Sequence, residues 1–251
     1  MTRPFADHFS GLAPAYAVHR PRYPESLFAW LATLTPRHEL AWDCAAGTGQ
    51  ASVGLTPFYR QVVATDASAG QIAAATPHPA VEFRVAPAAA SGLDAGSVDL
   101  VTVAQALHWI ELETFYPEVE RVLGPGGAIA VWTYGIHRIE AGIDRAVAEF
   151  YTDVVGKYWA PERRHVETGY RDLPFPFAEF PIPRFEMALE WTLEDLLGYV
   201  GTWSATARYR EVEGRDPIDQ LRDRVRPLWG DPRASRLVCW PLSIRAGRRG
   251  R

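Results

Sequence analysis

The first half of the chain alternates apolar strand-like segments with helical or turn-forming segments. Strands are predicted at 39–44, 61–65, 81–86, 98–104 and 128–133. The fourth of these is apolar almost throughout, as expected of a central parallel strand. Alternation of this kind predicts a parallel sheet with helices on both faces. Ligands of such sheets bind at the carboxyl ends of the strands, near the point where the strand order reverses.

The second half of the chain has a different pattern. Residues 139–170 are helical in pattern and rich in aromatic side chains, and 171–183 contain four prolines. Further elements are predicted as a strand at 184–190, helices at 192–201 and 217–228, and a last strand at 236–245. Because Pro241 falls in the middle of the last strand and proline interrupts a ladder, we expect a bulge or bend near Trp240 and Pro241.

Composition excludes several classes of protein. The chain has 251 residues, of which 47% are hydrophobic and 22% charged, as in ordinary soluble globular proteins. Its net charge of −4 gives no electrostatic case for nucleic-acid binding. No segment approaches the roughly 20 apolar residues of a membrane span, and residues 1–8 do not resemble a signal peptide. Cys44 and Cys239 have no metal-binding spacing, so we expect a cytoplasmic protein with free thiols and no metal.

The most informative motif follows the first predicted strand. Asp43 ends the strand, and Gly47 and Gly49 then open a helix. Glycine there allows backbone conformations closed to other residues and lets a ligand approach the chain closely. The spacing Gly-x-Gly-x-x-Ser, ending at Ser52, is one substitution from the dinucleotide fingerprint Gly-x-Gly-x-x-Gly.

Three residues help to separate a dinucleotide site from other nucleoside sites. Asp43 places a carboxylate at the strand end, which suits a cationic or amine-bearing ligand better than a pyrophosphate. Ser52 occupies the position of the third dinucleotide glycine. Asp66 ends the second strand, where an acid binds a ribose diol in both classes, so it indicates a nucleoside without choosing between them.

At this point a family resemblance emerges. The string Asp43 to Gln50 resembles the first motif of the class I S-adenosylmethionine-dependent methyltransferases, Asp-x-Gly-x-Gly-x-Gly, with Ala45 where the family usually has glycine. Residues 97–109 are similar to the fourth-strand segment of the trans-aconitate methyltransferase-like subgroup within the methyltransferase type 11 family, and 121–127 to its helix-to-strand turn. Segments 16–24 and 191–204 match in the right order as well, so the resemblance covers almost the whole chain.

The resemblance implies a fold and a division of the chain. The implied fold is an α/β Rossmann-like sheet of seven strands with helices on both faces and the last strand antiparallel. We expect a single domain, because no internal repeat and no long linker interrupts the chain. Within residues 1–251 the expected parts are an N-terminal lid and helix (1–36), a cofactor-binding core (37–133), a helical cap insertion (134–183) and a sheet-completing part (184–251).

The resemblance also implies the cofactor, S-adenosyl-L-methionine, with S-adenosyl-L-homocysteine as product. Asp66 is expected on the ribose hydroxyls, the Gly47–Gly49 backbone and Asp43 at the methionine end, and the Ala104–Gln105 carbonyls at the methionine amine. In place of the family's Ala-Glu near the adenine, this chain has Ala88 and Ala89, which leave only backbone contacts there. The full set of candidate cofactor-binding residues is Asp43, Ala45, Gly47, Thr48, Gly49, Asp66, Ala67, Ala88, Ala89, Ala104, Gln105, His108 and Trp109.

Candidate catalytic residues are His108, Tyr16 and Arg20. His108 is either a general base for a hydroxyl or carboxyl acceptor, or a hydrogen-bonded part of the pocket wall. A carboxylate acceptor needs no base at neutral pH. By resemblance Tyr16 and Arg20 lie on the lid, where Arg20 suits a bidentate carboxylate contact or, alternatively, packs on an aromatic ring.

Other polar and aromatic side chains have structural interpretations. Trp109 either stacks beside the sulfonium or fills the core. Asp99 is expected to be an exposed carboxylate at the start of its strand. The aromatic residues of the second half are expected to line the cap or to pack in the core, and they are Tyr151, Tyr158, Trp159 and Tyr170.

The expected function is therefore methyl transfer to the oxygen of a small molecule, with a carboxylate or hydroxyl as acceptor. We expect no nucleic-acid or membrane partner, and a monomer or weak homodimer. Two alternatives stay open. One is a methyltransferase-fold binding protein without turnover, which Ala45 and Ala89 allow, and the other is a nicotinamide-dependent oxidoreductase.

Overall fold

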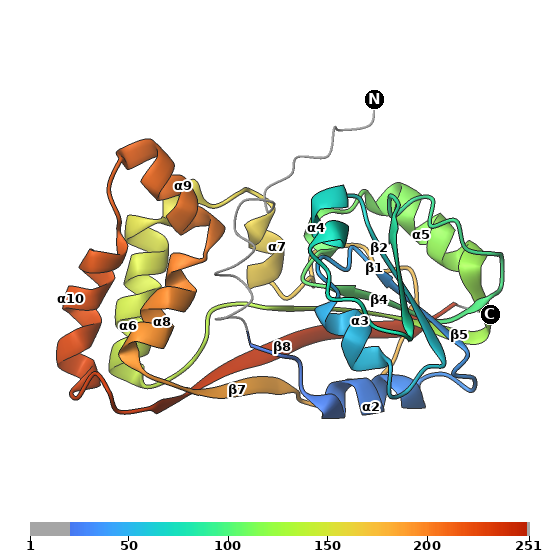
Figure 1. Cartoon of the computed structure of the whole chain (residues 1–251), viewed down its shortest axis with the longest axis horizontal. Coiled ribbons are helices and arrows are strands. Elements are labelled where there is room, and N and C mark those ends of the chain that lie inside the picture. The colour runs from blue at the N-terminus through green and yellow to red at the C-terminus, as the bar shows by residue number, and fades with distance from the viewer. Residues whose placement is uncertain (1–20, 250–251) are drawn as a thin grey trace.

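The computed structural model describes residues 21–249 and shows one large sheet flanked by helices (Figure 1). The strands are β1 (Leu40–Cys44), β2 (Gln61–Asp66), β3 (Val81–Val85), β4 (Val98–Ala104), β5 (Leu123–Tyr134), β6 (Ala178–Glu179), β7 (Glu186–Trp191) and β8 (Arg236–Arg248). Their order is β3-β2-β1-β4-β5-β8-β6, and β7 pairs with β8 outside this path. Strands β1 to β5 are parallel and β8 is antiparallel to β5, which confirms the predicted Rossmann-like sheet with an antiparallel last strand.

Alternate residues of the central strands are buried on opposite faces of the sheet, which explains why helices cover both faces. Trp42, Val101 and Val131 belong to one apolar cluster, which helix α5 (Leu112–Val122) covers with Phe115 and Val119. Their sequence neighbours point the other way. The second cluster holds Ala41, Leu100 and Ala130 from the sheet, together with side chains of α2 (Glu25–Thr33) and α3 (Gln50–Leu55). A shorter helix, α4 (Ala69–Ala73), follows β2.

A helical lobe extends beyond the sheet at one end of the molecule (Figure 1). Its members share a third apolar cluster that also includes side chains of β7 and the first half of β8. The helices outside the sheet layers are α6 (Ala141–Glu149), α7 (Arg163–Glu167), α8 (Leu193–Gly201), α9 (Ser204–Glu213) and α10 (Ile218–Trp229), with a π-helical turn at Phe150–Val154 and a 3-10 turn at Gly156–Tyr158.

The predicted helical run over 139–170 is therefore divided into short pieces. Pro161 lies between the 3-10 turn and α7, and Gly169 ends α7 with a φ of +63°. The structure also contains α9, which the sequence patterns did not indicate, whereas α8 and α10 lie where helices were predicted. Helix α8 begins with a capping box between Thr192 and Asp195.

Strand β8 joins the two parts of the molecule. Its first half, Arg236–Pro241, pairs with β7, and its second half, Leu242–Arg248, pairs with β5. Of the bulge or bend expected near Trp240 and Pro241, the bulge does not occur, because both pairings run without a shift of register. Proline is accommodated because the strand changes partners there, so Pro241 lies outside the ladder with β5. No helix of residues 21–249 has the length and apolar character needed to cross a membrane.

Candidate functional site

The carboxyl ends of β2, β1 and β4 lie next to one another in the middle of the sheet. Strand order reverses at β1, since β2 and β3 lie on one side of it and β4 and β5 on the other. This is the position at which open α/β sheets bind their ligands. The structure thus brings Asp43, Asp66 and Ala104 to one edge, as the sequence predicted.

The loop after β1 has an unusual backbone. Ala45, Gly47 and Gly49 all have positive φ, at +54°, +57° and +87°. The N–H of Ala46 donates to the carbonyl of Thr65 at the end of β2 (3.0 Å), which holds the loop against the sheet. A Cβ at Gly49 would lie 2.6 Å from Cε1 of Phe83, so any other residue would force this ring to move and would strain the backbone.

We expect Ala45→Gly to raise stability by about 0.5 to 1 kcal/mol, since the left-handed conformation costs alanine more than the added freedom of the unfolded chain costs glycine. The matched control is Ala46→Gly, at a neighbouring residue without positive φ. It should lower stability by a similar amount, roughly 0.5 to 1 kcal/mol. Urea unfolding of both variants shows whether each substitution raises or lowers the free energy of unfolding. A loss of stability in Ala45→Gly would contradict the assignment of strain to this residue.

Asp66 connects β2 to the glycine loop. Its Oδ2 accepts the N–H of Gly47 (2.9 Å) and its Oδ1 accepts the N–H of Ser68 (2.8 Å), and the residue is 9% exposed. A carboxylate has about four lone-pair sites, so two acceptor positions remain. The side chain is therefore held in place and keeps capacity for two further donors, such as a pair of vicinal hydroxyls.

Asp43 lies beneath the loop rather than on its surface, with no exposed area. Its two oxygens accept the hydroxyls of Ser52 on α3 (2.5 Å) and Thr102 on β4 (2.8 Å). Burial is the main cause that raises the pKa of Asp43 to about 6, against the opposing effect of the two hydroxyl bonds. The sequence patterns identified Asp43 as a candidate binding residue. They did not predict its hydrogen bonds to Ser52 and Thr102, although Ser52 belongs to the predicted helix.

The raised pKa of Asp43 predicts a pH dependence of stability. The folded protein holds this proton more tightly than the unfolded chain, so the contribution is complete below about pH 4 and is lost as the pH rises through about 6. The difference between about 6 and 3.8 corresponds to a loss of up to about 3 kcal/mol. In Asp43→Asn the hydroxyls can turn to accept from the amide, and this pH-dependent loss should disappear.

The measurement is the free energy of unfolding by urea at pH 4, 5, 6 and 7 for both proteins. Subtracting the two curves removes the contributions of all other titrating groups. A difference that does not change with pH would show that Asp43 titrates normally.

The β4 side of the site is held by hydrogen bonds to β5. Gln105, which directly follows β4, has a φ of +57°. Its side-chain amide donates to the carbonyl of Tyr134 (3.1 Å) and accepts the hydroxyl of Thr133. Because the side chain is engaged, the backbone carbonyls of Ala104 and Gln105 are the groups left for the predicted contact with an amine.

His108 lies in the 3-10 turn η1 (Leu107–Trp109) directly after this edge. Its Nδ1 is hydrogen-bonded to the hydroxyl of Tyr170 (2.9 Å), and its ring centroid lies 4.7 Å from that of Trp109. Burial, together with the nearby charges of Arg163 and His165, lowers the pKa of His108 to about 3. The imidazole is therefore neutral at pH 7 and a weak base, while Trp109 is 38% exposed beside it.

The remaining predicted residues fall into two groups. Thr48, Ala67 and Ala89 are exposed in the loops after β1, β2 and β3, with Ala88 half-buried beside Ala89. Tyr16 and Arg20 lie outside the described residues.

The expectation for Asp99 is wrong. It is only 2% exposed, since Arg37 donates to its Oδ1 (2.9 Å) and the N–H groups of Glu39 and Leu40 to its Oδ2. This carboxylate secures the start of β1 far from the ligand edge, a long-range contact that the local pattern did not reveal.

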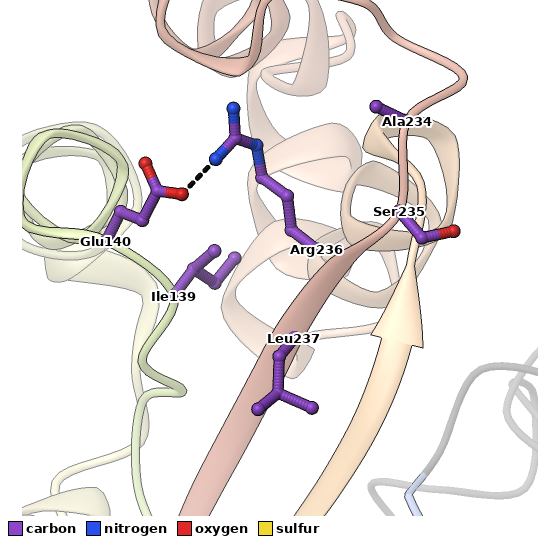
Figure 2. Close-up of a pocket in the computed structure, with 6 residues that line it drawn as sticks. All are labelled: Ile139, Glu140, Ala234, Ser235, Arg236 and Leu237. Carbon is purple, nitrogen blue, oxygen red and sulfur yellow. Dashed lines mark hydrogen bonds and ion pairs between the residues drawn. The ribbon is translucent and has the colours of Figure 1, made fainter.

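A pocket of about 380 Å³ lies elsewhere, where the start of α6 meets β8 (Figure 2). Arg236 forms an ion pair with Glu140 across it and donates to the carbonyl of Trp229 (2.8 Å). Ile139 and Leu237 also line the pocket. Its charged groups are already paired with each other and it does not adjoin the strand ends, so we do not assign the cofactor to it.

Comparison with known proteins identifies the family of this chain. A family model described as a methyltransferase domain matches residues 42–131. A Dictyostelium discoideum protein named as a methyltransferase is 32% identical and spans 88% of this chain and 86% of its own. An uncharacterized methyltransferase of Mycobacterium tuberculosis is 34% identical, spanning 88% and 84%.

The solved structures give the same result. A protein from Anaeromyxobacter dehalogenans, described as a type II methyltransferase, superposes with a TM-score of 0.87 at 44% identity, covering 91% of this chain and 97% of its own. The chain therefore belongs to the class I S-adenosylmethionine-dependent methyltransferases, as its motifs predicted.

Proposed function

We propose that the glycine loop, Asp66 and the end of β4 bind S-adenosylmethionine, and that the enzyme methylates an oxygen atom of a small molecule. The observation that carries the proposal is the state of Asp66. It is fixed by two backbone N–H groups at the strand end beside the order reversal, with two acceptor positions left for the ribose hydroxyls. Asp43, which has no exposed area, acts as a positioning residue through Ser52 and Thr102.

The residues of this chain align and surround the reaction. When bound, S-adenosylmethionine supplies a methyl group on a positively charged sulfur. Bound there, it would supply this methyl group to the acceptor oxygen and would be left as S-adenosylhomocysteine, so alignment of the acceptor is the main task of the protein. Trp109 offers an aromatic face, of the kind that stabilises cations, next to His108.

The low pKa of His108 favours an acceptor that is already ionised. With a pKa of about 3 the imidazole is a weak base, and its Nδ1 is engaged by Tyr170. A carboxylate carries its attacking lone pair at neutral pH and needs no proton removed. We therefore propose a carboxylate as the acceptor group, and a small acidic molecule rather than a nucleic acid, because the net charge of the chain is −4.

Ala45 gives no reason to prefer a binding protein without turnover. It adopts a φ of +54°, within the left-handed region where the family's glycine would have full freedom. The substitution therefore keeps the loop conformation at a modest cost in stability.

Isothermal titration with S-adenosylhomocysteine tests the cofactor site, and saturable binding at one equivalent is expected. Incubation with labelled S-adenosylmethionine and a panel of small acids, followed by mass spectrometry, then tests turnover. Absence of saturable binding would refute the cofactor site. Binding without any methylated product across the panel would contradict the proposed choice of acceptor.

A further inference from the structure

Helix α7 lies between the sheet and the helical lobe (Figure 1). It packs against the turn that carries His108, and Tyr170, three residues beyond the end of α7, holds the imidazole of His108 by its hydroxyl. Tyr170 has a φ of +64°, uncommon for a side chain of this size. The first residue of α7, Arg163, therefore starts a segment that is docked onto the ligand edge of the sheet.

Arg163 stacks on aromatic rings instead of pairing with a carboxylate. Its guanidinium carbon lies 4.7 Å from the ring centroid of Trp159 and 5.7 Å from that of Tyr151, and its Nε donates to the hydroxyl of Tyr151 (2.9 Å). That hydroxyl in turn donates to Glu167 (2.6 Å), so the carboxylate of Glu167 is connected to Arg163 only through the hydroxyl of Tyr151. Within residues 21–249 no acid forms an ion pair with Arg163, and its two terminal nitrogens have no protein acceptor.

A second unpaired donor belongs to the same stack. The indole nitrogen Nε1 of Trp159 is buried and has no hydrogen-bond acceptor in the described part of the chain. Buried polar groups are nearly always paired, so an orphaned donor of this kind calls for an explanation. The guanidinium stacked on the ring of Trp159 and the indole N–H of that ring both lack an acceptor oxygen, which a carboxylate would provide.

The charge of Arg163 also reaches the site described above. It is one of the causes that lower the pKa of His108, so the guanidinium is close enough to act on the imidazole at the strand edge. The rings of Tyr151, Trp159 and Trp203 pack against one another at 4.8 to 5.7 Å and form an apolar wall beside the cation.

We infer that Arg163 and the Trp159 indole bind a carboxylate of the methyl acceptor as an anchor, separate from the oxygen that is methylated. The inference rests on the proposed function and adds to it a specificity-determining residue. The acceptor class is a small molecule with a carboxylate besides its methylated oxygen, and its apolar part lies against the aromatic wall. Arg163 gives a bidentate contact of a kind that lysine does not reproduce.

The test is isothermal titration of the full chain saturated with S-adenosylhomocysteine. The probes are two acids, salicylate and glutarate, and their matched amides, salicylamide and glutaramide. We expect at least one acid to bind, and its amide to bind at least about tenfold more weakly. Arg163→Gln should abolish this preference, and Arg163→Lys should retain part of it. The matched control is Arg164→Gln, which changes the exposed next arginine of α7 and should leave the preference intact.

The outcomes separate the two levels of the proposal. Failure to bind S-adenosylhomocysteine in the first titration refutes the proposed function. Normal binding of S-adenosylhomocysteine, with neither acid bound or with equal affinity for acid and amide, overturns the anchor alone. Thermal unfolding checks that each variant is folded, and if Arg163→Gln does not fold, equal acid affinity in Arg163→Lys and the native protein overturns the anchor.

Discussion

Replacing Asp66 by alanine should lower the affinity for S-adenosylhomocysteine by at least about 100-fold, because hydrogen bonds to a charged group are worth about 1.5 to 3 kcal/mol each. The variant loses two things at once. It loses the acceptor for the ribose hydroxyls, and it leaves the N–H groups of Gly47 and Ser68 without their partner. The glycine loop is then no longer fixed to the end of β2.

Asp66→Asn separates these two effects. Its single carbonyl oxygen can accept one of the two N–H groups, while its amide repels the other. We therefore expect an affinity between those of the native protein and the alanine variant. The control is Asp223→Ala, which removes an exposed acid on α10 and should bind like the native protein. Isothermal titration measures all three, and native-like affinity in Asp66→Ala would refute its assignment to the ribose.

Gly49→Ala should destabilise the protein by about 4 kcal/mol, from the strain of a positive φ together with overpacking. The added methyl would lie 2.6 Å from the ring of Phe83, and the φ of +87° adds a backbone cost. Phe83 is on β3, so relief would require its half-buried ring to turn aside or its strand, which pairs with β2, to move. We expect a matching loss of S-adenosylhomocysteine binding, because the loop carries the proposed site.

Gly92 provides a matched control for the backbone part of this effect. Its φ is +72°, yet a Cβ there would have no atom within 4 Å. Gly92→Ala should therefore cost only about 1 to 2 kcal/mol. Urea unfolding of the two variants isolates the collision with Phe83 as their difference. Equal losses would show that the ring moves aside, and adding Phe83→Leu to Gly49→Ala should recover part of the stability.

The sheet and its ligand edge were largely predictable from sequence. Apolar runs and a period of two mark β1 to β5, since buried parallel strands require them, and the glycines and Asp66 stand where those strands end. Local pattern decides these features, so one sequence is enough to find them. The partners of Asp43 were missed because Ser52 and Thr102 lie on other elements, and their contact depends on packing.

The helical lobe and the buried state of Asp99 were harder to predict for the same reason. Asp99 pairs with Arg37, 62 residues away, and nothing in its neighbourhood indicates such a partner. Arg163 is one of many arginines, and only the structure shows that it stacks on Trp159 without an acid. Helix α9 has a polar sequence with a narrow apolar face, so its pattern was too weak to predict.

The shared strand β8 has a consequence for how the molecule unfolds. One continuous chain of 13 residues supplies the edge for β5 at one end and for β7 at the other. Melting either end exposes unpaired backbone of the same strand, so the two parts cannot lose structure independently at low cost. The lobe with Arg163 beside it and the layer with Asp66 should therefore denature as one cooperative unit. Because β8 is continuous, it also fixes the distance between the helical lobe and the sheet. Access of a ligand therefore depends on movement of the segments that lie beside β8, and not on a hinge within this strand.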